Sequence, residues 1–359
     1  FPKVMVMRDG KSRETRVLTR GIYNNPTDVV VSSNTPKSLP PFPNNAPKNR
    51  LGLAAWLVDA KHPLTARVTV NRIWQQFFGT GFVKTTENFG VQSERPSHPA
   101  LLDWLALEFI QSGWDVKALH KRIVLSATYR QSSRVTPAQY ERDPENRLLA
   151  HMTRQRLPSW MIRDQALFVS GLLVEKQGGP SVKPYQPNGV WAEATFGKKR
   201  YSQGKGEALY RRSLYTFWRR IVGPTMFFDE SKRQTCEVRR TRTNTPLHAL
   251  ITLNDIAYVE AARAMAQRVL KEGGVDDGMR VNYAFRLATS RQPKPQEQFL
   301  LKKRAEQLRA NYKKDTEAVK ALLTVGEFKR DETLDATDHA VYTVLCNLIL
   351  NLDEVITRE

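Results

Sequence analysis

Residues 236–255 read Cys-Glu-Val-Arg-Arg-Thr-Arg-Thr-Asn-Thr-Pro-Leu-His-Ala-Leu-Ile-Thr-Leu-Asn-Asp, a run of cations that leads directly into a helical pattern. Thr245 suits the N-cap and Pro246 suits the first helical position. If the approach is extended, Arg240 and Arg242 lie on one side of it, where the unpaired N–H groups of the helix add partial positive charge. The apolar face of the predicted helix comprises Leu247, Leu250, Ile251 and Leu253.

This helix entrance is the first candidate site, because arginine forks bind sulfate, phosphate or carboxylate oxygens in bidentate fashion. In the alternative interpretation, the arginines pair with internal carboxylates such as Asp229, Glu230 or Glu237 and brace the chain. The anion-binding candidates here are Arg239, Arg240, Arg242, Asn244, Thr245 and His248.

Composition places the chain among basic globular proteins. It has 359 residues, 40% of them hydrophobic, and a formal net charge of +20 from 56 Lys plus Arg against 36 Asp plus Glu. No apolar run approaches the roughly 20 residues that span a bilayer, so we expect no membrane span. Polyanions are the natural partners of such a charge, although a basic surface that only maintains solubility is the alternative.

The periodicity predicts a mainly α-helical fold: a multi-helix domain with a small β or irregular insertion and an N-terminal β-hairpin. The hairpin is expected from alternation at residues 4–7 and 15–20, and a Pro/Asn-rich linker completes residues 1–49. Residues 50–359 form the helical domain, with an irregular insertion at about 174–236 whose best strand candidate is 214–218. The predicted helices cover about 51–60, 64–78, 98–112, 115–127 and 158–170, and resume at 246, near 277–289, 295–312, 316–323 and 338–350.

Cofactor patterns do not occur in the sequence. Cys236 and Cys346 lie far apart, and neither a Cys-x-x-Cys-His haem site nor a zinc spacing is present, so we expect no cofactor and no metal. Burial as small apolar residues is the expected state of both cysteines, with a disulfide as the alternative.

Arg67 and Asn71 form a polar stripe on an otherwise apolar predicted helix, on the same face as Trp74. Polar groups that are buried must be hydrogen-bonded, so we expect a structural network. In the functional alternative, Arg67, Asn71 and Arg130 line a cleft shared with the helix entrance.

Acid–base chemistry has a few candidates. His98 precedes Asp103 by five residues, but its position between two prolines suits a loop end. His248 lies near a helix start, where the dipole disfavours a protonated ring. An enzyme would combine one of these histidines with one of the carboxylates Asp103, Asp164 or Asp255.

The insertion mixes aromatic side chains with cations. Such a mixture suits stacking on sugars or bases, while irregular segments equally need aromatic anchors to pack. The aromatic residues are Tyr185, Trp191, Phe196, Tyr201, Tyr210, Tyr215 and Trp218, among Lys198, Lys199, Arg200, Arg211 and Arg212.

Several motif blocks together resemble a known family. They are Arg67-Val-Thr-Val-Asn-Arg-Ile-Trp74, Phe78-Gly-Thr-Gly-Phe-Val83, Pro96-Ser-His-Pro-Ala-Leu-Leu-Asp-Trp104, Ser126-Ala-Thr-Tyr-Arg130, Arg163-Asp164, Gly178-Gly-Pro-Ser-Val182 and Arg239-Arg-Thr-Arg-Thr-Asn244. The chain resembles the C-terminal domain of unknown function of large planctomycete secreted proteins, often found with a cytochrome c-like domain. The resemblance covers nearly all of residues 50–353 and implies a periplasmic or extracellular, multidomain context. It implies no reaction, and the haem-bearing region is missing from this chain.

Our leading interpretation is therefore an extracytoplasmic, non-haem module that binds an anionic polysaccharide or an acidic protein domain. The alternative is an enzyme that acts on carbohydrate or in a redox system through Asp/His acid–base residues. Nucleic acid ranks third, because its charge fits but the implied compartment does not.

Overall fold

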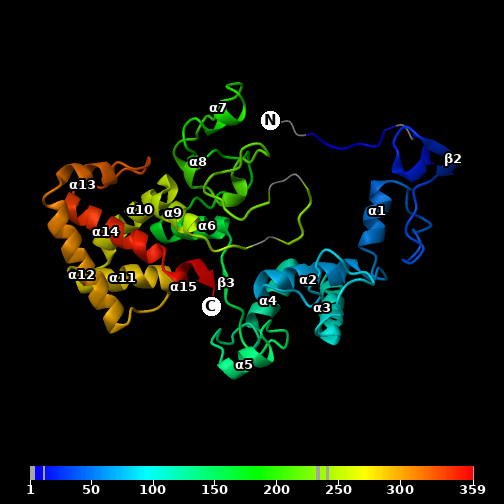
Figure 1. Ribbon diagram of the computed structural model, residues 1–359, viewed down its shortest axis with the longest axis horizontal. Coiled ribbons are helices and arrows are strands. Elements are labelled where there is room, and N and C mark those ends of the chain that lie inside the picture. Colours follow the sequence, from blue (N-terminus) through cyan, green and yellow to red (C-terminus); the bar gives the residue numbers. More distant parts are fainter. Residues whose placement is uncertain (1–4, 11–12, 232–234, 240–241, 359) are drawn as a thin grey trace. The chain divides into compact units, whose positions relative to one another are not determined.

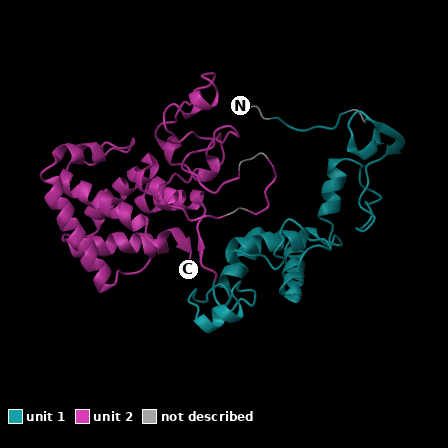
Figure 2. Ribbon diagram, in the orientation of Figure 1, with its two compact units in different colours: residues 1–152 teal, residues 153–359 magenta. Residues whose placement is uncertain are grey.

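The computed structural model describes residues 5–10, 13–231, 235–239 and 242–358. The chain forms two compact units, residues 1–152 and residues 153–359, which Figure 2 distinguishes by colour. Each unit has its own buried apolar cluster. The domain boundary predicted at residue 49 stays a prediction. The sequence did not predict the boundary at residue 152.

Unit 1 begins with a two-stranded antiparallel hairpin of β1 (Thr15–Leu18) and β2 (Pro26–Val31), joined through the short 3-10 turn η1 (Thr19–Gly21). The N-terminal hairpin is thus confirmed, but its predicted strand pair is wrong. The second strand comes from the presumed linker, where β-branched residues 29–31 favour extension. Met5 to Met7 form no strand, and Val4 lies outside the described residues.

The helices of unit 1 follow the predicted apolar periodicity. An apolar cluster that includes Val70, Trp74, Phe82 and Phe109 is buried between them. The bounds are α1 (Arg50–Leu57), α2 (Thr65–Phe78), α3 (Pro99–Gln111), α4 (Val116–Leu125) and α5 (Pro137–Arg142). Helix α5 was not predicted. Its N-terminal capping box, formed by Thr136 and Gln139, is recognisable in the sequence Thr-Pro-Ala-Gln.

Unit 2 is built around α10 (Ile256–Glu272), which packs against α6 (Ser159–Ser170) and α14 (Ala336–Leu350) (Figure 1). Small residues on α10, among them Ala261, Ala262 and Ala266, are fully buried and let the neighbouring helices approach closely. The other helices are α9 (Pro246–Asn254), α11 (Asp277–Thr289), α12 (Pro295–Tyr312), α13 (Thr316–Leu323) and α15 (Asp353–Ile356).

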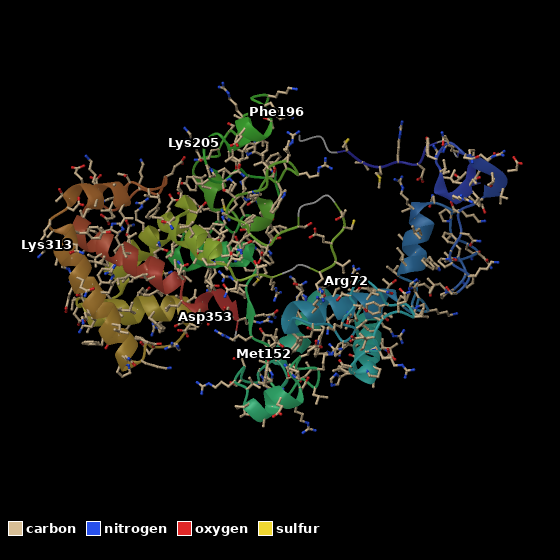
Figure 3. The ribbon with its side chains drawn as sticks, in the orientation of Figure 1. Arg72, Met152, Phe196, Lys205, Lys313 and Asp353 are labelled. Carbon is tan, nitrogen blue, oxygen red and sulfur yellow. The ribbon has the colours of Figure 1, made fainter. Side chains whose placement is uncertain are left out.

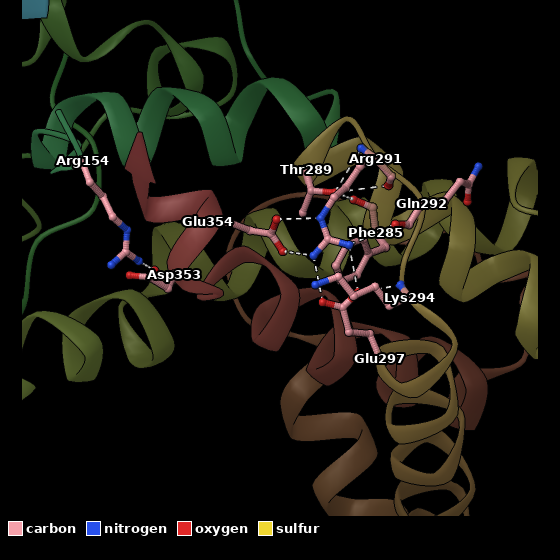
Figure 4. A network of polar contacts seen from close by, with 9 residues as sticks. All are labelled: Arg154, Phe285, Thr289, Arg291, Gln292, Lys294, Glu297, Asp353 and Glu354. Atoms are coloured by element: carbon pink, nitrogen blue, oxygen red, sulfur yellow. Dashed lines mark hydrogen bonds and ion pairs between the residues drawn. The ribbon is translucent and has the colours of Figure 1, made fainter. Parts of the chain in front are cut away.

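Polar contacts fix the ends of these helices. Asp276 accepts a hydrogen bond from the Met279 N–H at the start of α11. After α11 ends, Arg291 lies between two glutamates and over the Phe285 ring, as Figure 4 shows. Its Nη2 is 2.8 Å from Glu297 Oε1 and 2.6 Å from Glu354 Oε1, so it ties the α11–α12 turn to α15.

The irregular insertion is confirmed as mainly non-helical, but its predicted strand at 214–218 is wrong. Short helical turns interrupt it: α7 (Val190–Ala194), α8 (Glu207–Tyr210) and the 3-10 turn η2 (Ser213–Tyr215). Thr216 makes only an isolated bridge with Val182. A two-residue ladder of β3 (Gln155–Arg156) and β4 (Thr357–Arg358) joins the two ends of unit 2.

The two cysteines differ in environment. Cys346 is buried in α14, as expected, and burial raises the pKa of its thiol. Cys236 is exposed, contrary to the expectation, because it lies in an irregular segment that joins no apolar cluster. Across the part of the chain that is described, every helix is too short or too polar to cross a bilayer.

Candidate functional site

The predicted helix entrance forms where the sequence places it. Thr245 has extended backbone angles (φ −114°, ψ 152°) at the N-cap of α9, and Pro246 occupies the first turn. The Thr245 side chain makes no capping hydrogen bond. The position of the helix start is therefore confirmed, while the expected contribution of the Thr245 hydroxyl group is absent.

A carboxylate, Asp229, holds the segment that leads into α9. It accepts hydrogen bonds from the Thr243 N–H (2.6 Å) and the Thr243 hydroxyl (2.8 Å). His248 Nε2 lies 3.8 Å from Asp229 Oδ1, and its ring stacks on Phe228 with centroids 4.0 Å apart. Burial lowers the pKa of His248, although Asp229 opposes this effect. The ring is therefore best described as a neutral, packed group.

Arg156, which the sequence analysis did not select, also reaches this entrance. Its Nη1 donates to Asn244 Oδ1 at 2.5 Å, and its guanidinium lies over the Phe228 ring at 5.6 Å. The buried Nε and Nη2 atoms of Arg156 have no hydrogen-bond partner, and burial lowers its pKa. Asn244, although exposed, is thus engaged in a contact within the chain.

Of the remaining predicted cations of the entrance, the two that lie within the described residues are exposed. Arg242 is exposed and hydrogen-bonds the Gln155 side chain. Arg239 is exposed and forms no ion pair with another described residue. Arg240 lies outside the described residues. The entrance therefore divides into an internal brace around Asp229 and solvent-facing arginines.

The irregular segment of unit 2 is held to the helices by buried ionisable side chains, of which Arg163 on α6 is the first. It is 1% exposed, and its guanidinium donates to the carbonyls of Leu209 (2.7 Å) and Arg211 (3.0 Å) and to the Ser213 hydroxyl (3.1 Å). Asp164 accepts from the N–H (2.8 Å) and hydroxyl (2.6 Å) of Ser213. The Arg163-Asp164 pair is thus a structural clamp.

Arg211 extends this clamp to the glycine-rich loop. Its Nη2 donates to the carbonyls of Lys176 (2.7 Å) and Gly178 (2.6 Å), and its guanidinium lies 3.8 Å from the centroid of the Tyr215 ring. Gly178 has φ +72°, a left-handed conformation that favours glycine at this turn. The carbonyl groups of the Gly-Gly-Pro block therefore accept hydrogen bonds from Arg211. This structural role explains the block without a bound ligand.

Glu260 on α10 is the second anchor and is 1% exposed. Its Oε1 accepts from the hydroxyls of Tyr210 (2.9 Å) and Tyr185 (3.2 Å) and from the Phe328 N–H (2.6 Å). Gly326 packs so closely that an added Cβ would lie 2.3 Å from the carboxyl group. Glu260 therefore joins the irregular segment to the loop before α14.

Cations concentrate in residues 174–242, which we call the basic segment. It contains 15 Lys and Arg against 6 Asp and Glu, a net charge of +9 out of +20 for the chain. Exposed members that form no ion pair with a described residue are Lys176, Lys198, Lys199, Arg200, Lys205, Arg212, Arg219, Arg220 and Arg239. Figure 3 labels Phe196 and Lys205 on the part of unit 2 that carries α7 and α8.

In unit 1, the polar stripe of α2 is a structural network, as expected. Asn71 is fully buried and exchanges two hydrogen bonds with the backbone of Val83, at 2.9 and 3.0 Å. Arg67 Nε donates to Asp103 Oδ1 at 2.6 Å, which lowers the pKa of Asp103. Arg130 is exposed in the same unit. The alternative of a cleft shared with the α9 entrance stays a prediction.

An open groove of about 410 Å³ lies beside the Arg67–Asp103 pair. Its volume falls within the range of small-molecule sites. Its lining includes the apolar residues Phe89, Val91 and Pro96 and the charged residues Glu94 and Arg95.

The acid–base candidates are already engaged. Asp255 caps α10, and burial raises its pKa. His98 contacts the Ser97 hydroxyl at 3.1 Å and occupies the N-cap of α3. The described residues contain no group of three or more His, Cys, Asp or Glu side chains that could hold a metal ion.

A family model described as PSD1, a protein of unknown function (DUF1553), matches residues 49–304. The matched region runs from the N-cap of α1 into α12 and includes the whole basic segment. No curated protein and no solved structure gives a significant match to the chain.

Proposed function

We propose that this chain, which belongs to the PSD1 family of proteins of unknown function (DUF1553), binds an anionic polymer through the basic segment of unit 2. The observation that carries the proposal is the concentration of charge: residues 174–242 have 15 basic and 6 acidic side chains. Such a field attracts polyanions and raises their local concentration.

The arrangement of these cations supports binding over mere solubility. Several of them, such as Lys198, Lys199 and Arg212, are exposed and form no ion pair with a described residue. Within the same segment, Arg163, Arg211 and Glu260 clamp the chain at residues 176–178 and 209–213. A fixed backbone reduces the entropy lost when a ligand binds, so the segment suits a defined surface.

The ligand class that we favour is a sulfated or carboxylated polysaccharide, with an acidic protein domain as the alternative. The resemblance to planctomycete secreted proteins with a cytochrome c-like domain supports an extracytoplasmic location and makes nucleic acid a less favoured ligand. Fractionation of the source cells with an antibody against the chain tests that location: recovery in the cytoplasm would contradict it.

The binding test compares two double variants with equal charge loss. Lys198→Gln with Lys199→Gln removes two cations from the basic segment, and Lys302→Gln with Lys303→Gln removes two exposed cations from α12. We expect heparin or polygalacturonate to bind the wild-type chain, with affinity that falls steeply as salt rises. The first variant should weaken this binding far more than the second, measured by titration calorimetry.

A third variant tests the predicted entrance, with Arg239→Gln and Arg242→Gln. It should also weaken binding while circular dichroism shows an unchanged fold. Equal losses in the basic-segment and α12 variants would show that only diffuse net charge matters, and no binding by the wild-type chain would refute the proposal.

A further inference from the structure

The turn that follows α7, residues 195–200, presents an aromatic ring to solvent. We call it the Phe196 turn. Phe196 is 92% exposed and has φ +51°, a left-handed conformation that a bulky residue rarely adopts. Gly197 follows with φ +75°, and Lys198, Lys199 and Arg200 are all exposed. Figure 3 shows the Phe196 side chain at the outer end of unit 2.

Hydrogen bonds close this turn tightly. The Gly197 N–H donates to the Ala192 carbonyl at 2.7 Å. Thr195 Oγ1 donates to the Trp191 carbonyl at 2.6 Å and accepts from the Lys199 N–H at 3.0 Å. The two sides of the turn are thereby joined across its base, and the position of Phe196 is fixed by its neighbours.

The base of the turn is anchored by buried aromatic packing. Trp191 is 5% exposed, donates through Nε1 to Gln186 Oε1, and stacks on Tyr201 with ring centroids 5.6 Å apart. The Tyr201 hydroxyl donates to the Pro184 carbonyl at 2.7 Å, and burial raises its pKa to about 12. The aromatic residues of the segment therefore divide into anchors, such as Trp191, and one exposed ring, Phe196.

The left-handed backbone angle of Phe196 is unfavourable for a bulky residue. Such features persist when the surrounding structure fixes them, and they concentrate at sites of binding. An exposed ring beside three cations matches a ligand with an apolar ring face and anionic groups. We propose that Phe196 stacks on a sugar ring of the polyanion while Lys198, Lys199 and Arg200 bind its carboxylates or sulfates.

This inference rests on the proposed function and names the ligand class for the same segment. A charged glycan fits better than an anionic bilayer, because Phe196 is the one large apolar side chain of the turn and Glu193 is exposed just before it. Amphipathic helices that bind bilayers bury an apolar face built from several residues. The cations also extend well beyond the turn, as an extended polymer requires.

Salt titrations separate the two contributions. The slope of log affinity against log salt counts the cations that the ligand neutralises, whereas stacking changes affinity by the same factor at every salt concentration. With heparin and polygalacturonate as probes, we expect Phe196→Ala to weaken binding about tenfold without changing the slope. Lys198→Gln with Lys199→Gln should instead make the slope shallower.

Matched controls keep the test specific. Leu214 is 78% exposed in the same segment, so Leu214→Ala removes a comparable exposed apolar side chain and should leave affinity unchanged. Phe196→Trp should restore binding to at least the wild-type level, because it keeps an aromatic face.

The outcomes distinguish this inference from the proposed function. If the wild-type chain binds polysaccharide and Phe196→Ala binds equally well at every salt concentration, the stacking inference is wrong and the proposed function stands. If no salt-dependent binding occurs, the proposed function fails and the inference fails with it. If Phe196 is required for binding to vesicles that contain phosphatidylglycerol, but not for binding to either glycan, the partner is a membrane and the inference is overturned.

Discussion

Tyr210→Phe tests whether Glu260 anchors the basic segment to the helices. Tyr210 donates to Glu260 Oε1 at 2.9 Å, and burial together with the nearby carboxyl group raises the pKa of the Tyr210 hydroxyl, which therefore stays a proton donor. The substitution keeps the ring and removes only this hydroxyl. Glu260 then retains the Tyr185 hydroxyl at 3.2 Å and the Phe328 N–H at 2.6 Å.

The expected cost follows from the buried charge. A hydrogen bond to a charged group contributes about 1.5–3 kcal/mol to stability. Glu260 is 1% exposed, so water cannot replace the lost donor. We therefore expect Tyr210→Phe to lower the free energy of unfolding of unit 2 by about 2 kcal/mol.

Tyr258→Phe provides a matched control on α10. Tyr258 is 3% exposed, and its hydroxyl has no hydrogen-bond partner in the structure. It lines a small, mainly apolar cavity of about 10 Å³, to which Thr252 and Asn351 add polar groups, so there is room for at most one water. The same chemical change should therefore leave stability unchanged, or raise it by about 1 kcal/mol if the hydroxyl is unsatisfied.

Urea denaturation of the full chain measures both effects, followed by tryptophan fluorescence and circular dichroism. The two units can unfold in separate transitions, so the comparison uses the transition of unit 2. Equal losses from Tyr210→Phe and Tyr258→Phe would refute the reasoning, since hydroxyl deletion would then act independently of the carboxylate.

Three further predictions concern pH, helix capping and thiol reactivity. Hydrogen bonds from Arg291 lower the pKa of Glu297 from 4.5 to about 2, so the stabilisation is complete above about pH 5 and is lost as pH falls toward 2. This pKa shift corresponds to at most about 3 kcal/mol in the free energy of unfolding, and solvent screening reduces that contribution to about 1–2 kcal/mol. The Glu297→Gln variant should lose no such contribution when it is denatured by acid. Thr245→Ala should lower the free energy of unfolding by less than about 0.5 kcal/mol, because the Thr245 side chain makes no capping hydrogen bond. Asp276→Ala removes such a hydrogen bond and should lower it by about 1 kcal/mol, as measured by urea denaturation. Cys236 should react with a thiol reagent in the native protein and Cys346 only after denaturation, which mass spectrometry of the labelled chain would show.

Many helix positions could be predicted because their signals are local, although α5 and the central α10 were not among the predicted helices. Pro295 in the first turn of α12 and Gly171 in the left-handed C-cap of α6 act through their own backbone preferences. The strand predicted at 214–218 failed because aromatic and β-branched residues favour strands only when a neighbouring strand is available. Here Leu214 is exposed in a 3-10 turn and Thr216 meets Val182 at one bridge alone.

The buried hydrogen-bond networks could be predicted only in part. Asn71 was recognisable as a polar group on an apolar helical face, and its network is confirmed. No sequence pattern of this kind marks Glu260 or Arg211. The hydrogen-bond partners of Glu260 lie 50 or more residues away, and those of Arg211 lie in a loop. An acidic residue on an amphipathic helix usually faces water, so burial of Glu260 depends on the distant Tyr185 and Tyr210 hydroxyls.

These buried hydrogen-bond networks also explain why the motif blocks do not indicate a ligand site. Arg163, Asp164 and the glycines at 178 and 179 carry part of the family resemblance, yet the structure uses them to hold the basic segment together. Arg163 and Arg211 are buried and donate to internal carbonyls, so they are not presented to an external anion. Under the proposed function, ligand specificity is therefore expected in exposed residues such as Phe196 and Lys199, which belong to no motif block. A substitution in the clamp should therefore reduce binding only together with stability, whereas a substitution in the Phe196 turn should reduce binding alone.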